Sequence, residues 1–340
     1  MLHDLHLNAH VLQFEAEALT PIRWHPFKGS SLRGAWYGYL KRAYCTAPPQ
    51  ARQDPRHAER CPVCYLTARE NGPEARRPYA FRPPLARRTE LAPGERFTFG
   101  LVLFGPAWLL LPYVLTGMIA MGEYQGVGAY LPDLGHRGLF HIRRVDALNP
   151  LTGQRELVLH DRDRQVHLPS WAIHHEHVER HAQELLKELQ RPGSRLILDI
   201  LTPMRLIHQG RLVRQGFAFE PFFARLLERL YRLAEDYGTP PPQDPRATLR
   251  EARTTLQEAV AQVQVLADHT RWWDVQGFSR RTKRKQYLGG LVGRVELKAP
   301  PEVWALLLPA LVWGQITHVG KNVVKGAGWY KLSSKAEPEA

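Results

Sequence analysis

The two halves of the chain repeat one order of predicted elements, and this repeat constrains the fold more than any other feature. In the first half, a strand at 96–104 leads through a Gly-Pro turn to an apolar helix at 107–121, a glycine-rich loop and the strand LFHIRRV. In the second half, the strand LVGRVELKA leads through a Pro-Pro turn to the apolar helix EVWALLLPALVWG, the loop HVGKNVVKGAG and the strand WYKL. Such a repeat indicates a duplicated unit.

The segments upstream complete the same pattern in each half. Residues 9–18 alternate apolar and polar side chains as a half-buried strand does, and a helix capped by Ser30 or Ser31 follows to about Ala43. In the second half, SRLILDILTPMRLI predicts a strand, and two helices are predicted after it, at 219–237 and 247–267. Each half thus has the order β-α-β-β-α-β. We expect an α+β fold of two tandem ferredoxin-like domains.

The 340 residues are enough for two domains that each bury a core. We place the N-terminal domain at 1–167 and the C-terminal domain at 193–335. Residues 168–192, which are rich in histidine and partly helical in pattern, are expected to link them. The segment 45–88 contains cysteines, prolines and arginines with little periodicity, and we expect it to be an insertion in the first domain.

A cytoplasmic location is expected from three features of the sequence. The N-terminal MLHDLHLNAH lacks the apolar run of a secretory signal, and the three cysteines do not make a paired disulfide framework. Residues 97–122 carry no charge and are long enough to span a bilayer. Because Gly105-Pro106 and Pro112 interrupt this stretch, we interpret it as a buried strand followed by a core helix, with no membrane partner.

The net charge of +13 favours a polyanionic partner such as nucleic acid. The segment TRWWDVQGFSRRTKRKQYLGG concentrates this charge between aromatic residues. Cations for phosphates and aromatic faces for stacking are typical of proteins that bind single-stranded or looped RNA. The alternative for such a run is a solvated face without a partner. The candidate RNA-binding residues of the run are Arg280, Arg281, Lys283, Arg284 and Lys285.

The loop HVGKNVVKGAG contains a second set of candidate RNA-binding residues. Glycines expose backbone N–H groups, which bind anions, and nearby lysines attract anions over a longer range. The spacing matches neither a Walker loop nor a dinucleotide fingerprint, and a tight turn with solvated lysines is the alternative. The candidates are Gly320, Gly326 and Gly328 with Lys321, Lys325 and His318.

Several of these segments resemble one known family. LTPMRLIHQG, WWDVQGFSRRTKRKQYLGGLVG and HVGKNVVKGAGWYKL resemble the C-terminal region of the CRISPR-associated repeat-RNA processing endoribonucleases of the RAMP superfamily. FKGSSLRGAWYGYLKRAYC, CPVC and RRPYAFRPP resemble the N-terminal region of its longer members. The resemblance implies two ferredoxin-like domains and cleavage of CRISPR repeat RNA without a metal. Non-catalytic RAMP subunits of CRISPR effector complexes carry similar terminal loops, so an RNA-binding subunit is the alternative, and an unrelated basic RNA-binding protein is a third.

Metal-free RNA cleavage uses the substrate 2′-OH as nucleophile and leaves a 2′,3′-cyclic phosphate and a 5′-OH. It needs groups that move protons and stabilise phosphoryl charge. The resemblance implies a histidine base near the first helix, and His25 is the histidine closest to that helix, with His318 as the rival. Helical spacing places Arg33, a candidate RNA-binding residue, on one face with Tyr37 and Lys41. The candidates to complete the site are Lys28, Tyr37 and Lys41.

The cysteines offer a possible metal site apart from catalysis. Cys61 and Cys64 have the Cys-x-x-Cys spacing of zinc sites, and Cys45 with His57 would complete a Cys₃His set. Reduced thiols without a metal are the alternative. The segment HHEHVERH also offers His177 and His181 at helical spacing, but a solvated helix is the better interpretation there. No cofactor is expected to be required for catalysis.

Overall fold

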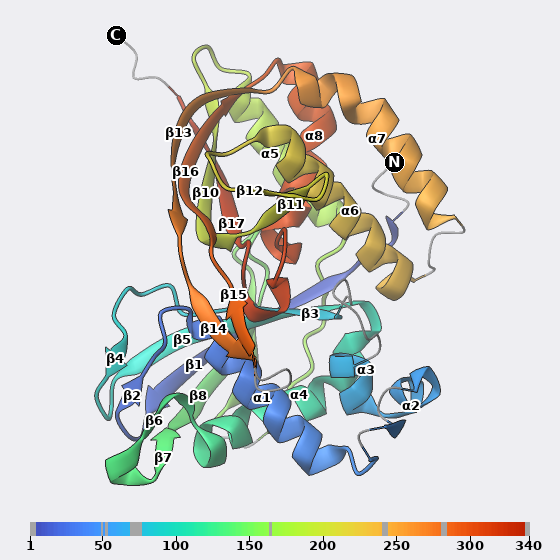
Figure 1. Cartoon of the computed structure of the whole chain (residues 1–340). Coiled ribbons are helices and arrows are strands. Elements are labelled where there is room, and N and C mark those ends of the chain that lie inside the picture. The colour runs from blue at the N-terminus through green and yellow to red at the C-terminus, as the bar shows by residue number, and fades with distance from the viewer. Residues whose placement is uncertain are drawn as a thin grey trace. The chain divides into compact units, whose positions relative to one another are not determined.

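A computed structural model describes residues 5–48, 50–51, 54–68, 77–162, 165–239, 244–279 and 284–336 (Figure 1). Its contacts divide the chain into two compact units. The first unit is Ala9–Ala172, and the second is Ile173–Ala340 together with Met1–Asn8. Helix α5 (His175–Leu189), in the segment expected to link the domains, packs within the second unit against helix α8 (Pro301–Thr317).

The first unit is built on a five-stranded antiparallel sheet with the strand order β3-β5-β1-β8-β9. The chain runs β1-α1-β3-β5-α4-β8 through this sheet, so the first four strands have the ferredoxin-like order, and β9 is added at an edge. The elements are β1 (Ala9–Ala18), β2 (Ile22–Arg23), α1 (Lys28–Tyr44), α2 (Pro55–Arg60), α3 (Pro62–Ala68), β3 (Tyr79–Arg82), β4 (Glu90–Leu91), β5 (Arg96–Phe104), η3 (Gly105–Leu110), α4 (Leu111–Ala120), η4 (Met121–Gln125), β6 (Val127–Leu131), η5 (Pro132–Leu134), β7 (His136–Gly138), β8 (Phe140–Leu148) and β9 (Arg155–His160).

Aromatic side chains fix the sheet and helix α1 of the first unit. Phe14 of β1 lies opposite Phe99 of β5, and their rings stack with centres 4.8 Å apart. Trp36 of α1 is fully buried and packs edge-on against Tyr79 and Phe81 of β3, at 5.1 and 5.7 Å. Such pairs add to the stabilisation from apolar burial. The helix that carries most of the predicted catalytic residues is therefore anchored through its apolar face.

The uncharged stretch forms a buried strand and a mostly buried helical segment, as predicted. β5 ends at Phe104, and the helical segment Gly105–Gln125 follows. This segment is the one in the described part of the chain that is long and apolar enough to cross a membrane, by length and composition only. In the structure, residues such as Val114 and Met118 are completely buried in the first unit. Core packing accounts for the apolar composition.

The second unit repeats the arrangement with the strand order β13-β16-β10-β17, again antiparallel throughout. Helices α6, α7 and α8 pack against one another beside this sheet (Figure 1). Both units thus have the ferredoxin-like strand order, which confirms the predicted fold class. The further elements are β10 (Arg195–Met204), β11 (Leu206–His208), β12 (Arg211–Val213), α6 (Phe219–Tyr237), α7 (Pro245–Ala261), β13 (Gln264–Trp273), β14 (Gln276–Ser279), β15 (Arg284–Tyr287), β16 (Gly290–Lys298), η6 (Val323–Lys325) and β17 (Tyr330–Lys335).

Two local predictions are wrong. Helix α1 begins at Lys28 after Phe27, whose side chain makes no capping hydrogen bond, so Ser30 and Ser31 lie inside the helix. The helix predicted over 247–267 ends at Ala261, and β13 begins at Gln264. Most side chains of β13 are exposed, so the alternation that identifies a half-buried strand is missing there. Pairing with β16 along its whole length determines its conformation instead.

Candidate functional site

Three side chains on one face of α1 stack on one another in the first unit. The guanidinium carbon of Arg33 lies 4.4 Å from the centre of the Tyr37 ring, and Lys41 Nζ lies 4.9 Å from the same centre. Their four-residue spacing places them on one face, as predicted. The face of the Tyr37 ring offsets the charge of a neighbouring cation only in part. The three side chains together therefore keep a positive charge that can attract phosphate. We call Arg33, Tyr37 and Lys41 the α1 ridge.

The other two predicted catalytic residues lie at the opposite end of α1. His25 is exposed in the turn before the helix. Lys28 is 5% exposed, and its Nζ donates a hydrogen bond to the Ala86 carbonyl. Burial, with a smaller effect of Arg88, lowers the pKa of Lys28. At 1.5 Å per residue, Lys28 and Lys41 stand about 20 Å apart along the helix axis. The structure therefore does not bring the predicted catalytic residues into one cluster, and the Lys28 side chain is directed into the protein.

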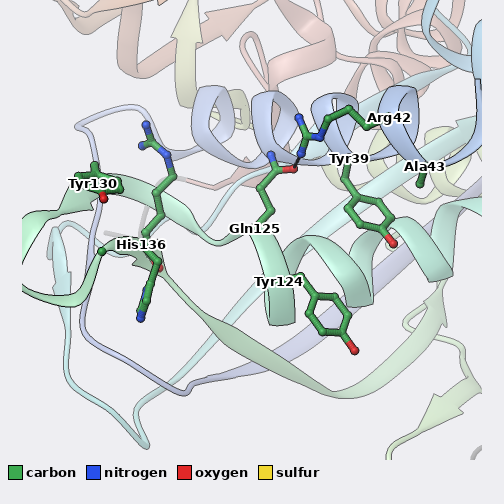
Figure 2. A pocket seen from close by; sticks show the side chains of 9 residues that line it. Tyr39, Arg42, Ala43, Tyr124, Gln125, Tyr130 and His136 are labelled. Carbon is green, nitrogen blue, oxygen red and sulfur yellow. Dashed lines mark hydrogen bonds between the residues drawn. The ribbon is translucent and has the colours of Figure 1, made fainter.

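A pocket of about 530 Å³ opens beside the C-terminal half of α1. Figure 2 shows Arg42 of α1 hydrogen-bonded to Gln125 of η4, with Tyr39 and Tyr124 on the same side of this pair. Tyr124 and Tyr130 are 77% and 55% exposed, so their rings are available to a ligand. The complete lining is Tyr39, Arg42, Ala43, Tyr124, Gln125, Tyr130, Gly135, His136 and Arg137.

The polar groups of this pocket are held in place by backbone contacts. Gln125 Nε2 donates to the Ala35 carbonyl at 2.8 Å, and Arg137 donates to the Gly128 carbonyl. His136 Nδ1 lies 2.7 Å from the Arg137 carbonyl. A carbonyl only accepts, so Nδ1 carries the proton, and Nε2 of neutral His136 is a proton acceptor. Cations, ring faces and a histidine thus meet in one pocket whose lining residues include no carboxylate.

None of the residues that line this pocket was predicted from the sequence. The glycine-rich loop GEYQGVGAYLPDLGHRG was predicted as the counterpart of the terminal loop, without a site residue in it. The sequence did contain a signal for a ligand-binding surface, because this loop carries two tyrosines followed by His136 and Arg137. The hairpin of β6 and β7 brings these residues to α1, and no spacing in the sequence reports that contact.

The terminal glycine-rich loop of the second unit uses many of its own backbone N–H groups. Eight N–H groups between residues 318 and 329 donate to protein acceptors, including Gly328 to the Pro203 carbonyl at 3.0 Å and Lys321 to the Arg205 carbonyl at 3.0 Å. The other six belong to His318, Val319, Lys325, Gly326, Ala327 and Trp329. The prediction of a loop of bare amides open to phosphate is therefore wrong for these eight groups.

Two glycines of this loop are required for a close approach of protein backbone. Gly320 and Gly328 have positive φ angles of 94° and 69°. A Cβ atom at Gly328 would lie 1.8 Å from the Val319 carbonyl oxygen, and one at Gly320 would lie 2.5 Å from the Arg205 carbonyl oxygen. The glycines thus allow the loop to pack on the protein itself. Their direct contact with phosphate stays a prediction.

His318 is fully buried, which contradicts the prediction that its side chain contacts RNA or catalyses cleavage in this conformation. Its ring stacks on Trp329 with centres 5.9 Å apart and an angle of 11°. The preceding Thr317 carbonyl accepts a hydrogen bond from Arg229 Nε at 2.6 Å. Burial lowers the pKa of Arg229 to about 9. These contacts make His318 an anchor of the loop.

Three of the predicted RNA-binding cations of the second unit belong to this loop or to the neighbouring β15. Lys321 and Lys325 are half-buried, and Lys325 Nζ donates to Gln286 Oε1. Lys285 in β15 is exposed. Three predicted RNA-binding residues, Arg280, Arg281 and Lys283, lie outside the residues that the structure describes, as does the side chain of Arg284.

Trp272 provides an aromatic face in the same unit. The guanidinium carbons of Arg205 and Arg214 lie 5.7 and 5.0 Å from the centre of its ring. Arg205 also accepts the Lys321 N–H through its carbonyl, so this group is connected to the terminal loop. Aromatic rings with neighbouring arginines are typical of surfaces that stack nucleobases. Neither arginine was predicted as a site residue; Arg205 directly follows β10, and Arg214 directly follows β12.

The cysteines and His57 come together in the first unit. The ligand atoms of Cys45, His57, Cys61 and Cys64 all lie within 4.8 Å of one another. Burial, together with the neighbouring Cys45 and Cys61, raises the pKa of the Cys64 thiol to about 12. The spacing in sequence predicted this set, and the helices α2 and α3 bring it together beside the end of α1.

Comparison with known families gives two matches. Residues 198–330 match the model of the CRISPR-associated endoribonuclease Cas6, and residues 7–170 match a model described as an N-terminal domain. No curated protein matches the sequence at a significant level.

Solved structures share the fold at low sequence identity. A partial Cas6-RT-Cas1–Cas2 complex matches with a TM-score of 0.60 and 12% identity, over 100% of this chain and 48% of that chain. The Cas6-RT-Cas1–Cas2 complex gives the same score and identity over 100% of this chain and 30% of that chain. A product complex of Cas6 from Thermus thermophilus matches at 0.50 and 16% identity, over 96% and 99% of the two chains. This chain thus spans about half the length, or less, of the first two.

The match over 198–330 falls on the unit that carries the terminal loop, and the fold of both units is that of Cas6 and RAMP proteins. The chain is therefore similar to Cas6 over residues 198–330, and this match supports a RAMP-like CRISPR protein.

Proposed function

We propose that this chain is an endoribonuclease that binds CRISPR repeat RNA and cuts it into guide RNAs. The observation that carries the proposal is the match of residues 198–330 to the CRISPR-associated endoribonuclease Cas6. The net charge of +13, the α1 ridge and the basic aromatic pocket support RNA as the ligand. Since two similar structures are of a Cas6-RT-Cas1–Cas2 complex, we propose that CRISPR proteins are its partners.

The proposed chemistry needs no metal ion. The 2′ oxygen bonds to the adjacent phosphorus, the bond from phosphorus to O5′ breaks, and the products carry a 2′,3′-cyclic phosphate and a 5′-OH. A base removes the 2′ proton, an acid protonates O5′, and cations stabilise the added charge on the phosphoryl oxygens.

His25 is the proposed acid–base residue, because it is exposed whereas His318 is buried. Charge stabilisation by Lys28 is not supported, since its side chain is buried against the Ala86 carbonyl. Arg33 is the member of the α1 ridge nearest to the start of α1, about 8 Å along the axis from Lys28. A phosphate near His25 can therefore reach Arg33 more easily than Lys41, which lies much further along the helix.

A non-catalytic RNA-binding subunit is the second candidate function. Two observations favour it: the predicted catalytic residues do not converge, and His318 is buried. A labelled repeat RNA incubated with the protein in magnesium-free buffer with EDTA separates the two candidates. Cleavage to 5′-OH products supports the enzyme, and tight binding without cleavage supports the subunit. If the RNA is cut only after magnesium is added back, the metal-free chemistry is wrong.

Two further experiments test the mechanism. A single 2′-deoxy nucleotide at the cut site is expected to abolish cleavage and leave binding unchanged, because the nucleophile is removed. His25→Ala is expected to lower the single-turnover rate by about 10²–10⁴-fold, the usual contribution of a general acid or base. His167→Ala, an exposed histidine apart from the candidate sites, is the control. If His136→Ala lowers the rate and His25→Ala does not, the reaction belongs to the pocket beside α1.

A further inference from the structure

The set of Cys45, His57, Cys61 and Cys64 is assembled by three helices of the first unit. Cys45 follows the last residue of α1, His57 lies in α2, Cys61 ends α2, and Cys64 lies in α3. The Cys61 N–H donates to the His57 carbonyl at 2.9 Å, which fixes the turn between two of the four residues. Cys45 and Cys64 are 4% and 0% exposed, so two of the sulfur atoms are shielded from solvent.

The distances within this set are those of ligands around one tetrahedral ion. Cys45 Sγ lies 3.5 Å from His57 Nε2 and 3.6 Å from Cys64 Sγ. Tetrahedral zinc with Zn–S bonds of about 2.3 Å and Zn–N bonds of about 2.0–2.1 Å places neighbouring ligand atoms roughly 3.5–3.8 Å apart. A disulfide would need sulfur atoms about 2.05 Å apart, and Cys45, Cys61 and Cys64 form no disulfide with one another. Two of the ligand-atom distances thus already match bound zinc, and all four ligand atoms lie within 4.8 Å of one another, close enough for one ion to draw them together.

We propose that Cys45, His57, Cys61 and Cys64 bind one zinc ion with a structural role. Three thiolates and one imidazole suit zinc, and four protein ligands leave no open position for a water molecule or substrate. His57 binds through Nε2, the nitrogen that faces Cys45 Sγ, and its Nδ1 carries the proton. The zinc therefore takes no part in the cleavage chemistry, and the proposal does not depend on the proposed function.

The site determines how the end of α1 is held. Cys45 directly follows the last turn of α1, which contains Lys41 and Arg42. Zinc bound to Cys45 connects the last turn of α1 to α2 and α3. These two helices are short, so the zinc adds a link that their own packing would otherwise have to supply. Since metal binding contributes directly to folding in small sites of this kind, loss of zinc is expected to loosen the C-terminal part of α1 and the pocket beside it.

Metal analysis of the full-length protein, purified without chelator, tests the proposal. About one equivalent of zinc is expected per chain, and a content below roughly a tenth of an equivalent overturns it. His57→Ala is expected to lower the retained zinc at least about tenfold after dialysis, in line with the loss of one ligand. His167→Ala is the matched control, because it removes an exposed histidine from the same unit. If His57→Ala keeps the zinc content of the control, the metal binds elsewhere and the proposal fails.

A second measurement uses the unaltered protein, so that it does not depend on how a variant folds. Titration of the thiols with a mercurial reagent, in the presence of a zinc indicator, is expected to release zinc in step with the reaction of the three cysteines. Cobalt exchanged for zinc is expected to show the visible absorption of tetrahedral thiolate coordination. Zinc that stays bound after all three thiols have reacted, or cobalt with the spectrum of oxygen ligands, contradicts the proposed set.

Discussion

The backbone angle of a single residue, Gly328, determines how the terminal loop packs. Its φ of 69° is one that residues with a side chain rarely adopt, and its N–H donates to the Pro203 carbonyl at 3.0 Å. A methyl group there would meet the Val319 carbonyl at 1.8 Å. His318 is buried and stacks on Trp329, the residue after Gly328. Gly328, which was predicted from the sequence as a phosphate contact, thus allows two backbone segments of the protein to approach closely.

Gly328→Ala is predicted to destabilise the second unit strongly. The substitution adds both the cost of a left-handed backbone angle and a clash with backbone, and we expect a loss of roughly 3 kcal/mol or more in the free energy of unfolding. Gly210→Ala is the matched control, since Gly210 has a φ of 76° and no atom within 4 Å of the added Cβ. It is expected to cost about 1–2 kcal/mol. Urea unfolding measures both, and equal losses would contradict the role assigned to the close contact.

At the scale of elements, the sequence predicted those whose side chains alternate or repeat strongly. β1, β5 and α6 have the predicted bounds, because each buries one regular face or lies wholly in the core. β3 was assigned to an irregular insertion, since four buried residues are too short a run to show a period. The first four residues of β13 were predicted as the end of a helix, because its mostly exposed side chains do not alternate as those of a half-buried strand do. Its pairing with β16 is a tertiary effect that overrides local propensity.

The parts of the candidate site also divide into those that a spacing in the sequence predicts and those that form only through tertiary contacts. The α1 ridge was predictable, because residues four apart on one helix must share a face. The cysteine and histidine set was also predictable, since the Cys-x-x-Cys spacing narrows the possible ligands. The pocket beside α1 was not, because it forms only when the β6–β7 hairpin folds back on the helix. The burial of His318 was equally invisible, since it depends on stacking with Trp329.

An ion network that spans three strands of the first unit predicts acid sensitivity. Arg143 of β8 bonds Glu17 of β1 at 3.1 Å and Asp161, just after β9, at 2.8 Å. The hydrogen bonds of Arg143 lower the pKa of both carboxyl groups below their usual 4.5 and 3.8. A carboxyl group with a lowered folded pKa stabilises the fold above its unfolded pKa. This contribution is lost as pH falls through the lower, folded pKa.

The melting temperature of Arg143→Gln is therefore predicted to lie below that of the unaltered protein at pH 7. The difference is expected to shrink as pH falls from about 4 through the lowered pKa values of the two carboxyl groups, and to disappear once both are protonated in either protein. Arg96→Gln serves as the control, because Arg96 is more exposed and lies 3.7 Å from Glu17 alone. Its effect at pH 7 should be smaller. A difference between Arg143→Gln and the unaltered protein that is independent of pH would show that packing, not ionisation, explains it.

At the scale of the whole molecule, the duplication has given its two copies different surfaces. In each unit a glycine-rich segment follows the apolar helix and precedes the last ferredoxin-like strand. In the first unit this segment forms the hairpin that opens the pocket with Tyr124 and His136. In the second unit it closes on its own backbone around His318 and presents Lys321 and Lys325 at its rim. The same fold thus forms a basic pocket in the first unit and a compact basic loop in the second unit.

Binding of the RNA is predicted to depend steeply on salt, and the dependence can distinguish local contacts from overall charge. For single-stranded RNA, each phosphate contact contributes about −0.7 to the slope of log affinity against log salt concentration. Lys41→Gln removes one cation of the α1 ridge, and Lys187→Gln removes one exposed cation of α5, outside the described candidate sites. Both variants change the net charge of +13 by the same single unit. We expect Lys41→Gln to reduce the steepness of the slope by about 0.7 and Lys187→Gln to leave it nearly unchanged, as measured by filter binding over a range of salt concentrations. If the two variants reduce the slope equally, the charge of the whole protein attracts the RNA, and the α1 ridge makes no specific contact.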